Sequence, residues 1–221
     1  MNIIMLGAQG TGKGTVASAI CEQTGMLQIS TGDIFRKNIS EKTPLGIEAD
    51  KYISKGNLVP DEITVPMVED RLTWDDAKNG VILDGFPRTI EQAKKLDEIL
   101  NAKGEKIDLV INLVTPKEEI IDRMLTRRVC TNPDCKATYN TKLHPPKVEG
   151  ICDKCGAPLK QRDDDSNPEA IKRRLEIYEE KTSPLVEYYK NKGVLRTETV
   201  SISINRMGKD VANDIVKDIK K

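Results

Sequence analysis

A glycine-rich loop near the N-terminus, GAQGTGKGT at residues 7–15, restricts the possible folds more than any other part of the sequence. It follows a short apolar run at 2–6 and precedes a segment, 13–25, whose pattern predicts a helix that Gly25 ends. A strand, a Gly-x4-Gly-Lys loop and a helix in this order are what a phosphate-binding loop requires. Glycines let backbone N–H groups converge on phosphate oxygens, the helix dipole adds to them, and Lys13 can reach the terminal phosphates. The loop therefore predicts a nucleoside triphosphate site, in preference to a simple glycine turn with an exposed lysine.

Strand-like and helix-like segments alternate along most of the chain. Further buried strands are expected at 80–84, at 108–114 and near 196–202. Helical patterns are expected at 33–40, 44–56, 61–72 (with Pro66 as a possible kink), 89–104, 116–128, 168–192 and from 208 onward. This alternation predicts an α/β fold, in which a doubly wound parallel sheet carries helices on both faces. Residues 129–162, rich in Pro, Cys, Lys and Asn, show neither period and are expected to form an insertion.

The charge balance and the absence of long apolar runs limit the function classes. The chain has 35 basic and 35 acidic residues, whereas a general nucleic-acid binder usually carries an excess of positive charge. No stretch approaches the roughly 18 apolar residues of a membrane span, and the N-terminus lacks the pattern of a signal peptide. The expected location is cytoplasmic, where thiols stay reduced and a cysteine cluster indicates a metal more often than disulfides.

Four of the five cysteines lie in the predicted insertion, at Cys130, Cys135, Cys152 and Cys155. Their spacing, Cys-x4-Cys and Cys-x2-Cys separated by sixteen residues, fits a four-thiolate zinc site. Four thiolates leave no open coordination position, so such a zinc would be structural, replacing a core that a short segment cannot build. Two disulfides, or iron in the same geometry, remain alternatives. A zinc-ribbon module that binds nucleic acid is a further alternative, although Tyr139 is the one aromatic residue available for base stacking.

Several charged residues form a second candidate phosphate site. Asp84 ends a predicted buried strand, where a carboxylate can hold magnesium or simply cap a turn, and Arg88 follows in a turn stiffened by proline. Arginines also bracket the insertion on both sides: Arg123, Arg127 and Arg128 before it, and Arg162, Arg173 and Arg174 after it. Arg123 and Arg127 are expected on one face of a helix, where they could equally complement its C-terminal dipole. Transfer of a phosphoryl group between two phosphates needs such positive donors and alignment.

Six ordered motifs now point to one family: GAQGTGKGT, STGDIFR at 30–36, GNLVPDE at 56–62, DGFPRTIEQ at 84–92, DRMLTRR at 122–128 and HPPKVEG at 144–150. Over essentially its whole length the chain resembles the adenylate kinases, in their long-lid bacterial form. The resemblance implies a P-loop fold with a five-stranded parallel sheet and reversible, magnesium-dependent transfer of the γ-phosphoryl group of ATP to AMP, giving two ADP. It also implies three domains: a core of 1–29, 60–128 and 163–221, a helical AMP-binding part of 30–59, and a small zinc-bound β-type lid of 129–162.

The same resemblance implies roles for individual residues. For ATP it implies a phosphate cradle of Gly10, Thr11, Gly12, Lys13, Gly14 and Thr15, adenine stacking by Arg123, and further contacts from Arg127, Thr138, Tyr139 and Arg206. For AMP it implies Thr31, Arg36, Leu58, Val59, Gly85, Arg88, Gln92, Arg162 and Arg174. The catalytic set would be Lys13, Asp84, Arg88, Arg123, Arg162 and Arg174. The choice of Arg174 over Arg173 stays open, because the segment 163–168 is one residue longer than usual in the family. A separate departure is Gln9, which replaces the proline usual in the phosphate-binding loop.

The expected partners are ATP, AMP and ADP, with no nucleic acid, no membrane and a monomeric state. Another nucleoside monophosphate kinase, of the UMP/CMP or GTP:AMP type, is the alternative within the same class, and Thr31 with Gln92 favours AMP. The resemblance also implies that the lid closes over the nucleotides, a motion for which adenylate kinases are a known example. Closure would keep water away from the phosphoryl group in transit.

Overall fold

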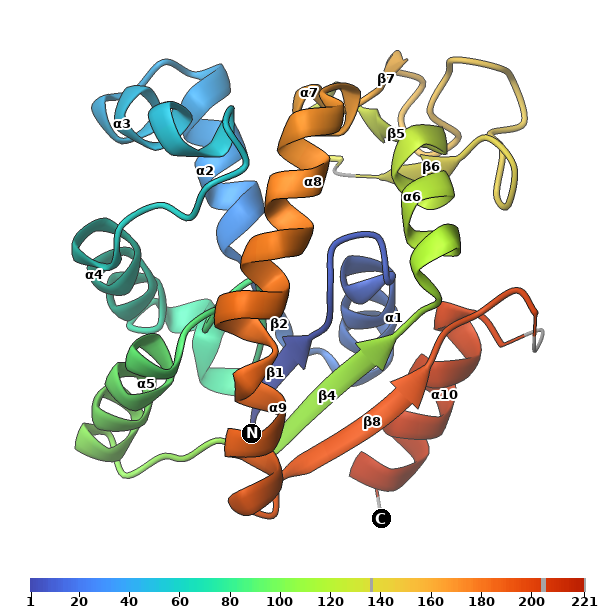
Figure 1. Ribbon diagram of the computed structural model, residues 1–221. Coiled ribbons are helices and arrows are strands. Elements are labelled where there is room, and N and C mark those ends of the chain that lie inside the picture. Colours follow the sequence, from blue (N-terminus) through green and yellow to red (C-terminus); the bar gives the residue numbers. More distant parts are fainter. Residues whose placement is uncertain (136, 204–205, 221) are drawn as a thin grey trace.

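The computed structural model describes residues 1–135, 137–203 and 206–220. Its centre is a sheet in the order β2-β3-β1-β4-β8, with every neighbouring pair parallel (Figure 1). The strands are β1 (Asn2–Leu6), β2 (Leu27–Ser30), β3 (Val81–Asp84), β4 (Leu109–Val114) and β8 (Leu195–Thr199). From β1 the chain goes to the edge strand β2, returns to β3 beside β1, and then adds β4 and β8 on the other side of β1. The carboxyl ends of β1, β3 and β4 therefore flank the crevice where such sheets bind ligands. The predicted five-stranded α/β fold is confirmed.

The sheet is buried on both faces because successive side chains of a strand point to opposite sides. In β1, Ile3 and Met5 pack with α1 (Lys13–Thr24) and α10 (Gly208–Ile219) in one hydrophobic cluster. Ile4 and Leu6 belong to a second cluster, which includes residues of three helices on the other face. These helices are α4 (Asp61–Arg71), α5 (Ile90–Ala102) and α9 (Pro184–Asn191). A continuous apolar run such as NIIML is therefore what this position requires.

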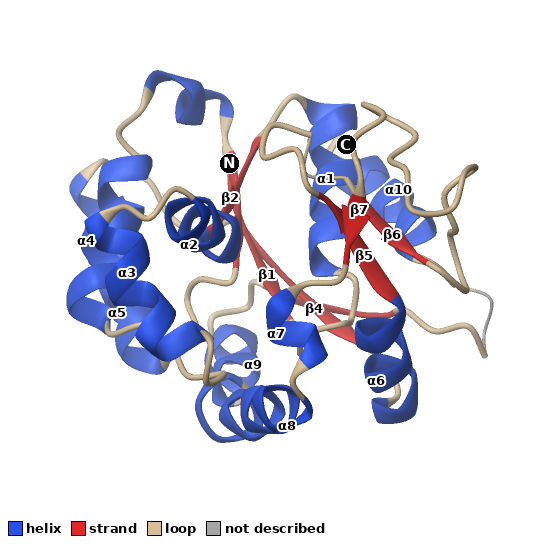
Figure 2. Cartoon of the chain, turned by 90° about the horizontal axis from the view of Figure 1, so that it is seen from above, coloured by secondary structure: helices blue, strands red, loops and turns tan. Residues whose placement is uncertain are grey.

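A helical segment stands over one end of the sheet. It consists of α2 (Thr31–Ser40) and α3 (Pro44–Ile53), and Figures 1 and 2 show it on the side of β2. Its own small cluster of buried side chains is Phe35, Ala49 and Val59. A serine caps the first of these helices: the side chain of Ser30 accepts a hydrogen bond from Asp33 N at 3.2 Å. A 3₁₀ helix, η1 (Asp75–Asn79), precedes β3.

A second, antiparallel sheet in the order β6-β5-β7 lies above the opposite side of the main sheet (Figure 1). Its strands are β5 (Arg127–Cys130), β6 (Thr138–Asn140) and β7 (Leu159–Lys160). The helix α6 (Lys117–Thr126) leads into it, and α7 (Asp163–Ser166) and α8 (Pro168–Ile177) lead out of it. In Figure 2 the small sheet and the α2–α3 segment lie on opposite sides of α8. The predicted domain limits stay a prediction, and the ranges 129–162 and 163–221 include positions outside the described residues.

Three expectations about elements were wrong. The strand β2 has no counterpart among the predicted segments, because four residues at the sheet edge carry little periodic signal. Arg127 does not share a helix face with Arg123, because α6 ends at Thr126 and Arg127 pairs with Asn140 in the small sheet. The helix predicted over 168–192 is divided by a π-helical turn, η2 (Tyr178–Thr182), shortly before Pro184, whose missing N–H cannot continue the ladder. In the described ranges, no helix is long and apolar enough to cross a bilayer.

Candidate active site

The phosphate-binding loop connects β1 to the N-terminus of α1. Three of its glycines have backbone angles that other residues rarely adopt, with φ of 131° at Gly7, 82° at Gly10 and 95° at Gly12. A Cβ on Gly7 would also lie 2.5 Å from the carbonyl oxygen of Leu113, so only glycine fits there. Lys13 bends back over the loop, and its Nζ donates to the carbonyl oxygens of Gly7 and Ala8 at 2.8 Å each. The predicted loop geometry therefore exists with its lysine on the inner side.

Lys13 is held in an environment that favours binding of an anion. Burial and the repulsion of nearby arginines together lower the pKa of Lys13 to about 8, against the attraction of Asp84. Arg88 is the strongest of these neighbours. A bound phosphate would place a negative charge next to the Lys13 ammonium and would therefore raise its pKa again.

The arginines on either side of the small sheet are paired with consecutive aspartates. Arg127 binds the carboxylate of Asp165 with two hydrogen bonds, at 2.7 and 2.6 Å, and Asp165 is fully buried. Arg174 pairs with Asp164 at 2.8 Å. Both aspartates lie in α7, so this short helix links the arginine of the small sheet to the arginine of α8. The sequence analysis did not single them out, although three aspartates in a row after Arg162 were a visible signal.

Further cations surround this group. Arg36 pairs with Asp33 at 2.5 Å, one helical turn away. Burial, and then the positive charge of Arg174, lower the pKa of Arg88. Burial, and then Arg36, lower the pKa of Arg162. The Nε of Arg162 is buried and has no hydrogen-bond partner among the described residues. Positive groups gather here in excess of what their aspartates neutralise, which is the arrangement expected for phosphate binding.

A pocket lies between α2, α3, the carboxyl end of β3 and α8. All the predicted AMP-binding residues except Arg162 line it. Its remaining lining residues, which the sequence analysis did not name, are Gly32, Phe35, Ile53, Gly56, Asn57, Thr64 and Asp164. Gly56 meets α8 closely, because a Cβ there would lie 2.6 Å from the carbonyl oxygen of Ala170. The apolar residues among them were not predicted because the sequence pattern of their segments indicates only the buried side of a helix.

Hydrogen bonds within the pocket hold Gln92 in one orientation. Its Oε1 accepts from Arg88 N at 2.7 Å, and its Nε2 donates to Asp61 Oδ1 at 2.6 Å. The side chain of Arg88 is held in turn, since its Nε donates to the carbonyl oxygen of Gly85 at 2.9 Å. Both residues are therefore fixed before any ligand binds.

Arg173 and Arg174 have different surroundings. The Arg174 side chain is 16% exposed and lines the pocket. The Arg173 side chain is 47% exposed, donates from Nε to Asn57 Oδ1 at 3.2 Å and pairs with Glu176. The geometry favours Arg174 as a ligand of phosphate, and its role stays a prediction.

The residues predicted for the ATP base are more dispersed. Arg123 is buried in α6, where its Nη2 donates to Glu119 at 2.9 Å and to the carbonyl oxygen of Val200 at 3.3 Å. Arg206 pairs with Glu198 at 2.7 Å and with Asp214 at 3.0 Å, and Thr138 lies on β6. Their contacts with ATP stay predictions.

Asp84 lies beside the start of α1. A Cβ on Gly14 would be 3.6 Å from Asp84 Oδ2, and Gln28 Nε2 donates to the same oxygen at 3.4 Å. The carboxylate at the end of β3 therefore lies close to the phosphate-binding loop.

Comparison with known proteins identifies the family to which this chain belongs. A family model described as adenylate kinase matches residues 5–194. A protein named adenylate kinase from Clostridium kluyveri is 52% identical over 207 residues, which cover 94% of this chain and 94% of that protein. The chain belongs to the adenylate kinase family. The adenylate kinase from Clostridium tetani is 52% identical over 213 residues (96% of this chain and 97% of that protein), and the one from Clostridium botulinum is 49% identical over 218 residues (99% and 100%).

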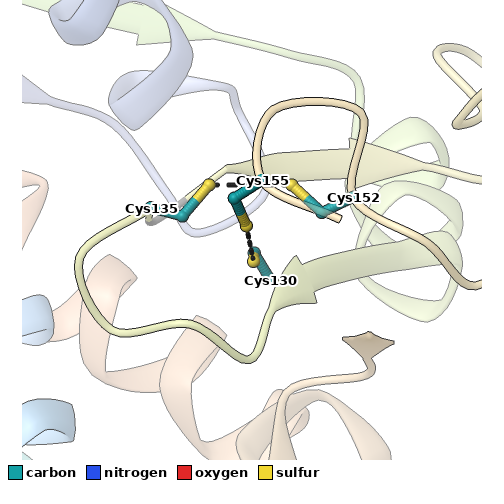
Figure 3. A group of neighbouring side chains, drawn as sticks. All are labelled: Cys130, Cys135, Cys152 and Cys155. Atoms are coloured by element: carbon teal, nitrogen blue, oxygen red, sulfur yellow. Dashed lines mark hydrogen bonds between the residues drawn. The ribbon is translucent and has the colours of Figure 1, made fainter. Parts of the chain in front are cut away.

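In this adenylate kinase family member, the four cysteines of the small sheet gather as their spacing predicted (Figure 3). Their sulfur atoms lie within 4.8 Å of one another, with 3.4 Å between Cys130 and Cys155 and 3.6 Å between Cys135 and Cys152. Four thiolates at about 2.3 Å from one tetrahedral ion would stand about 3.8 Å apart, so the cluster has the size of a metal site. A hydrogen bond with the Tyr139 hydroxyl lowers the pKa of the Cys152 thiol to about 6, whereas burial raises the pKa of the Cys130 thiol to about 12.

Proposed function

We propose that this protein is an adenylate kinase that transfers the γ-phosphoryl group of ATP to AMP and runs the reaction in both directions. One observation carries the proposal: Arg88 and Arg174 line the pocket of the predicted AMP residues and also belong to the group of cations whose charge acts on Lys13. A monophosphate in that pocket and a triphosphate on the loop would meet at Arg88 and Arg174. The match to the family over residues 5–194 supports the same activity.

The residues act mainly by position and charge. In the transition state the transferred group spreads negative charge over its outer oxygens, and fixed cations stabilise that charge better than mobile water does. Lys13 would bind the terminal phosphates of ATP, and Arg88 and Arg36 would bind the phosphate of AMP. Arg127, Arg162 and Arg174 would converge on the phosphoryl group between them. Because aspartates already hold Arg127 and Arg174, little reorganisation is needed.

Magnesium is expected with ATP, since the family uses the Mg·ATP complex. Asp84 fits this ion, because its carboxylate lies at the end of β3 next to the first turn of α1. We propose that Asp84 orients the ion, with Gln28 holding the carboxylate. When bound, the ion would neutralise part of the negative charge of the phosphates.

The cysteine cluster is proposed to hold zinc. The four sulfur atoms are at a spacing that suits a tetrahedral ion, and such a closed site stabilises structure rather than taking part in chemistry. Zinc would join Cys130, at the end of β5, to the segments that carry Cys135, Cys152 and Cys155, so that Arg127 at the start of β5 is presented from a stable segment. The small sheet would then act as the lid over ATP.

A coupled assay of ADP formation from ATP and AMP, run beside UMP, CMP and GMP, tests the activity. AMP is expected to be the preferred acceptor, since Gln92 and its partners fix an amide in the acceptor pocket. A clear preference for UMP or CMP would overturn the choice of substrate. Metal analysis of the same sample is expected to give one zinc per chain.

The cytoplasmic location, the monomeric state and the absence of nucleic-acid binding stay predictions. Light scattering with and without nucleotide measures the mass in solution. Filter binding of DNA and RNA at low salt tests the alternative of a zinc-ribbon module, which would show strongly salt-dependent affinity.

A further inference from the structure

The Glu119 carboxylate joins two parts of the chain on the ATP side of the molecule. It lies in the first turn of α6, and one of its oxygens accepts from Arg123 Nη2 at 2.9 Å. The same oxygen accepts from Ile202 N at 3.1 Å, and the other oxygen accepts from Ser201 Oγ at 2.5 Å. A single side chain thus holds both the arginine of α6 and the segment that follows β8.

This arrangement is largely buried. Ser201 is 1% exposed, Arg123 is 8% exposed and the Glu119 side chain is 16% exposed. Burial opposes ionisation, but hydrogen bonds from Ser201 and from the backbone N–H of Ile202 lower the pKa of Glu119, so it carries its charge at neutral pH. Such a buried and fully engaged carboxylate does more than cap a helix.

The segment after β8 depends on the same carboxylate. The carbonyl oxygen of Val200 accepts from Thr115 Oγ1 at 2.7 Å and from Arg123 Nη2 at 3.3 Å. Ser201 Oγ also accepts from Ser203 N at 3.2 Å. Residues 200–203 and Arg123 therefore form one hydrogen-bonded unit with Glu119 at its centre.

We propose that Glu119 is a positioning residue for the donor nucleotide, which sets the orientation of the Arg123 guanidinium against the ATP base. The proposal rests on the proposed function, in which Arg123 stacks on adenine. A guanidinium stacks through its flat faces and binds carboxylates through its edge, so Glu119 can hold the edge and leave a face for the base. The Nε of Arg123 is buried without a hydrogen-bond partner in the described part of the chain, so Glu119 and Val200 alone hold the group by hydrogen bonds.

The test compares Glu119→Gln with Glu118→Gln, which changes an adjacent exposed side chain in the same way. In Glu119→Gln, the KM for ATP is expected to rise about tenfold, which corresponds to about 1.4 kcal/mol. The KM for AMP and kcat should stay within about twofold, because the acceptor pocket and the phosphate-binding groups are untouched. Glu118→Gln should match the parent enzyme in all three constants.

A double-mutant cycle separates positioning from a purely structural role. If Glu119 acts through Arg123, then in an Arg123→Ala background Glu119→Gln should change kcat/KM for ATP less than about twofold. Additive losses, or equal rises in both KM values together with a lower melting temperature, would overturn the proposal. An unchanged KM for ATP in Glu119→Gln would overturn it as well.

A second variant covers the case in which Glu119→Gln folds poorly. Ser201→Ala removes one donor to Glu119 and leaves the ion pair with Arg123 in place. Ser201→Ala should raise the KM for ATP alone, by less than Glu119→Gln does. An unchanged KM for ATP would contradict the hydrogen-bonded unit of Glu119, Arg123 and residues 200–203. Failure of the proposed function has a different signature, since the parent protein would then form no ADP from ATP and AMP.

Discussion

Two groups of polar side chains, the cations around Lys13 and the four cysteines, are organised in opposite ways. The cations come from the phosphate-binding loop, α2, β5 and α8, and the main sheet beneath them packs two large clusters of buried hydrophobic residues. The cysteines belong to a cluster in which Cys130, Ala137 and Cys152 are the only buried members among the described residues. The first group is supported by a core that folds without it, whereas the second supplies the core of its own segment.

This difference indicates separate roles for the cations and the cysteines. A set of buried arginines and aspartates is costly to assemble, and it persists here because the surrounding fold holds the groups together. A segment of some thirty residues cannot bury enough apolar surface to fold alone, so a metal bound at its centre, as proposed, would supply the missing stabilisation. Loss of a cation should therefore affect the rate, and loss of a cysteine should affect stability.

Removal of the Lys13 ammonium should give the largest effect. Lys13→Ala is expected to lower kcat/KM about 10³-fold or more, because it removes a positive group next to the transferred phosphate. The melting temperature should change little, since the helix and sheet around the loop remain. Coupled assays measure kcat/KM and calorimetry measures the melting temperature. Lys172→Ala, which changes an exposed lysine of α8, is the control. A near-normal rate would remove Lys13 from the catalytic set.

The next comparison is between neighbouring arginines. Arg174→Ala is expected to lower kcat about 10²-fold, the scale on which loss of one donor to a developing charge acts. Arg173→Ala should stay within about threefold, since that side chain points to solvent and contacts Asn57. The reverse order of effects would show that the longer segment after Arg162 shifts the register of the ligands.

The pH dependence should expose the low pKa of Lys13. Phosphate binding needs the charged form, so kcat/KM for ATP is expected to fall about tenfold per pH unit as pH rises through about 8. The stability effect has the opposite sign: above pH 8 the folded state releases a proton that the unfolded state still holds, so this group then favours folding more. Measurement of kcat/KM for ATP from about pH 6 to about pH 10 tests the expected fall in rate, and a value that does not change with pH contradicts it.

Loss of the metal should have the smallest effect on rate. Cys135→Ser, or treatment with a chelator, is expected to lower the melting temperature by about 5 °C while the rate at low temperature falls less than about tenfold. Cys21→Ser is the matched control, because Cys21 lies in α1 outside the cluster. Equal melting of the treated and untreated proteins would show that the cluster does not depend on a metal.

The sequence by itself determined the fold class, the phosphate-binding loop and the cluster of four cysteines. Each depends on residues close together in the chain: Gly7 to Lys13 form one loop between a strand and a helix, and the cysteine pairs have fixed short spacings. The family followed from the order of motifs, and the comparisons confirmed it.

Only the tertiary structure decided which charges meet. Arg127 was expected on a helix and lies on β5, where Asp165 of α7 binds it. The setting of Arg174 in the pocket and the contacts of Glu119 with Ser201 and Ile202 also depend on segments far apart in the chain. Local patterns specify which face of a helix or strand is buried, but ion pairs depend on where those elements come to rest against one another. The long-range packing of the main sheet sets those positions.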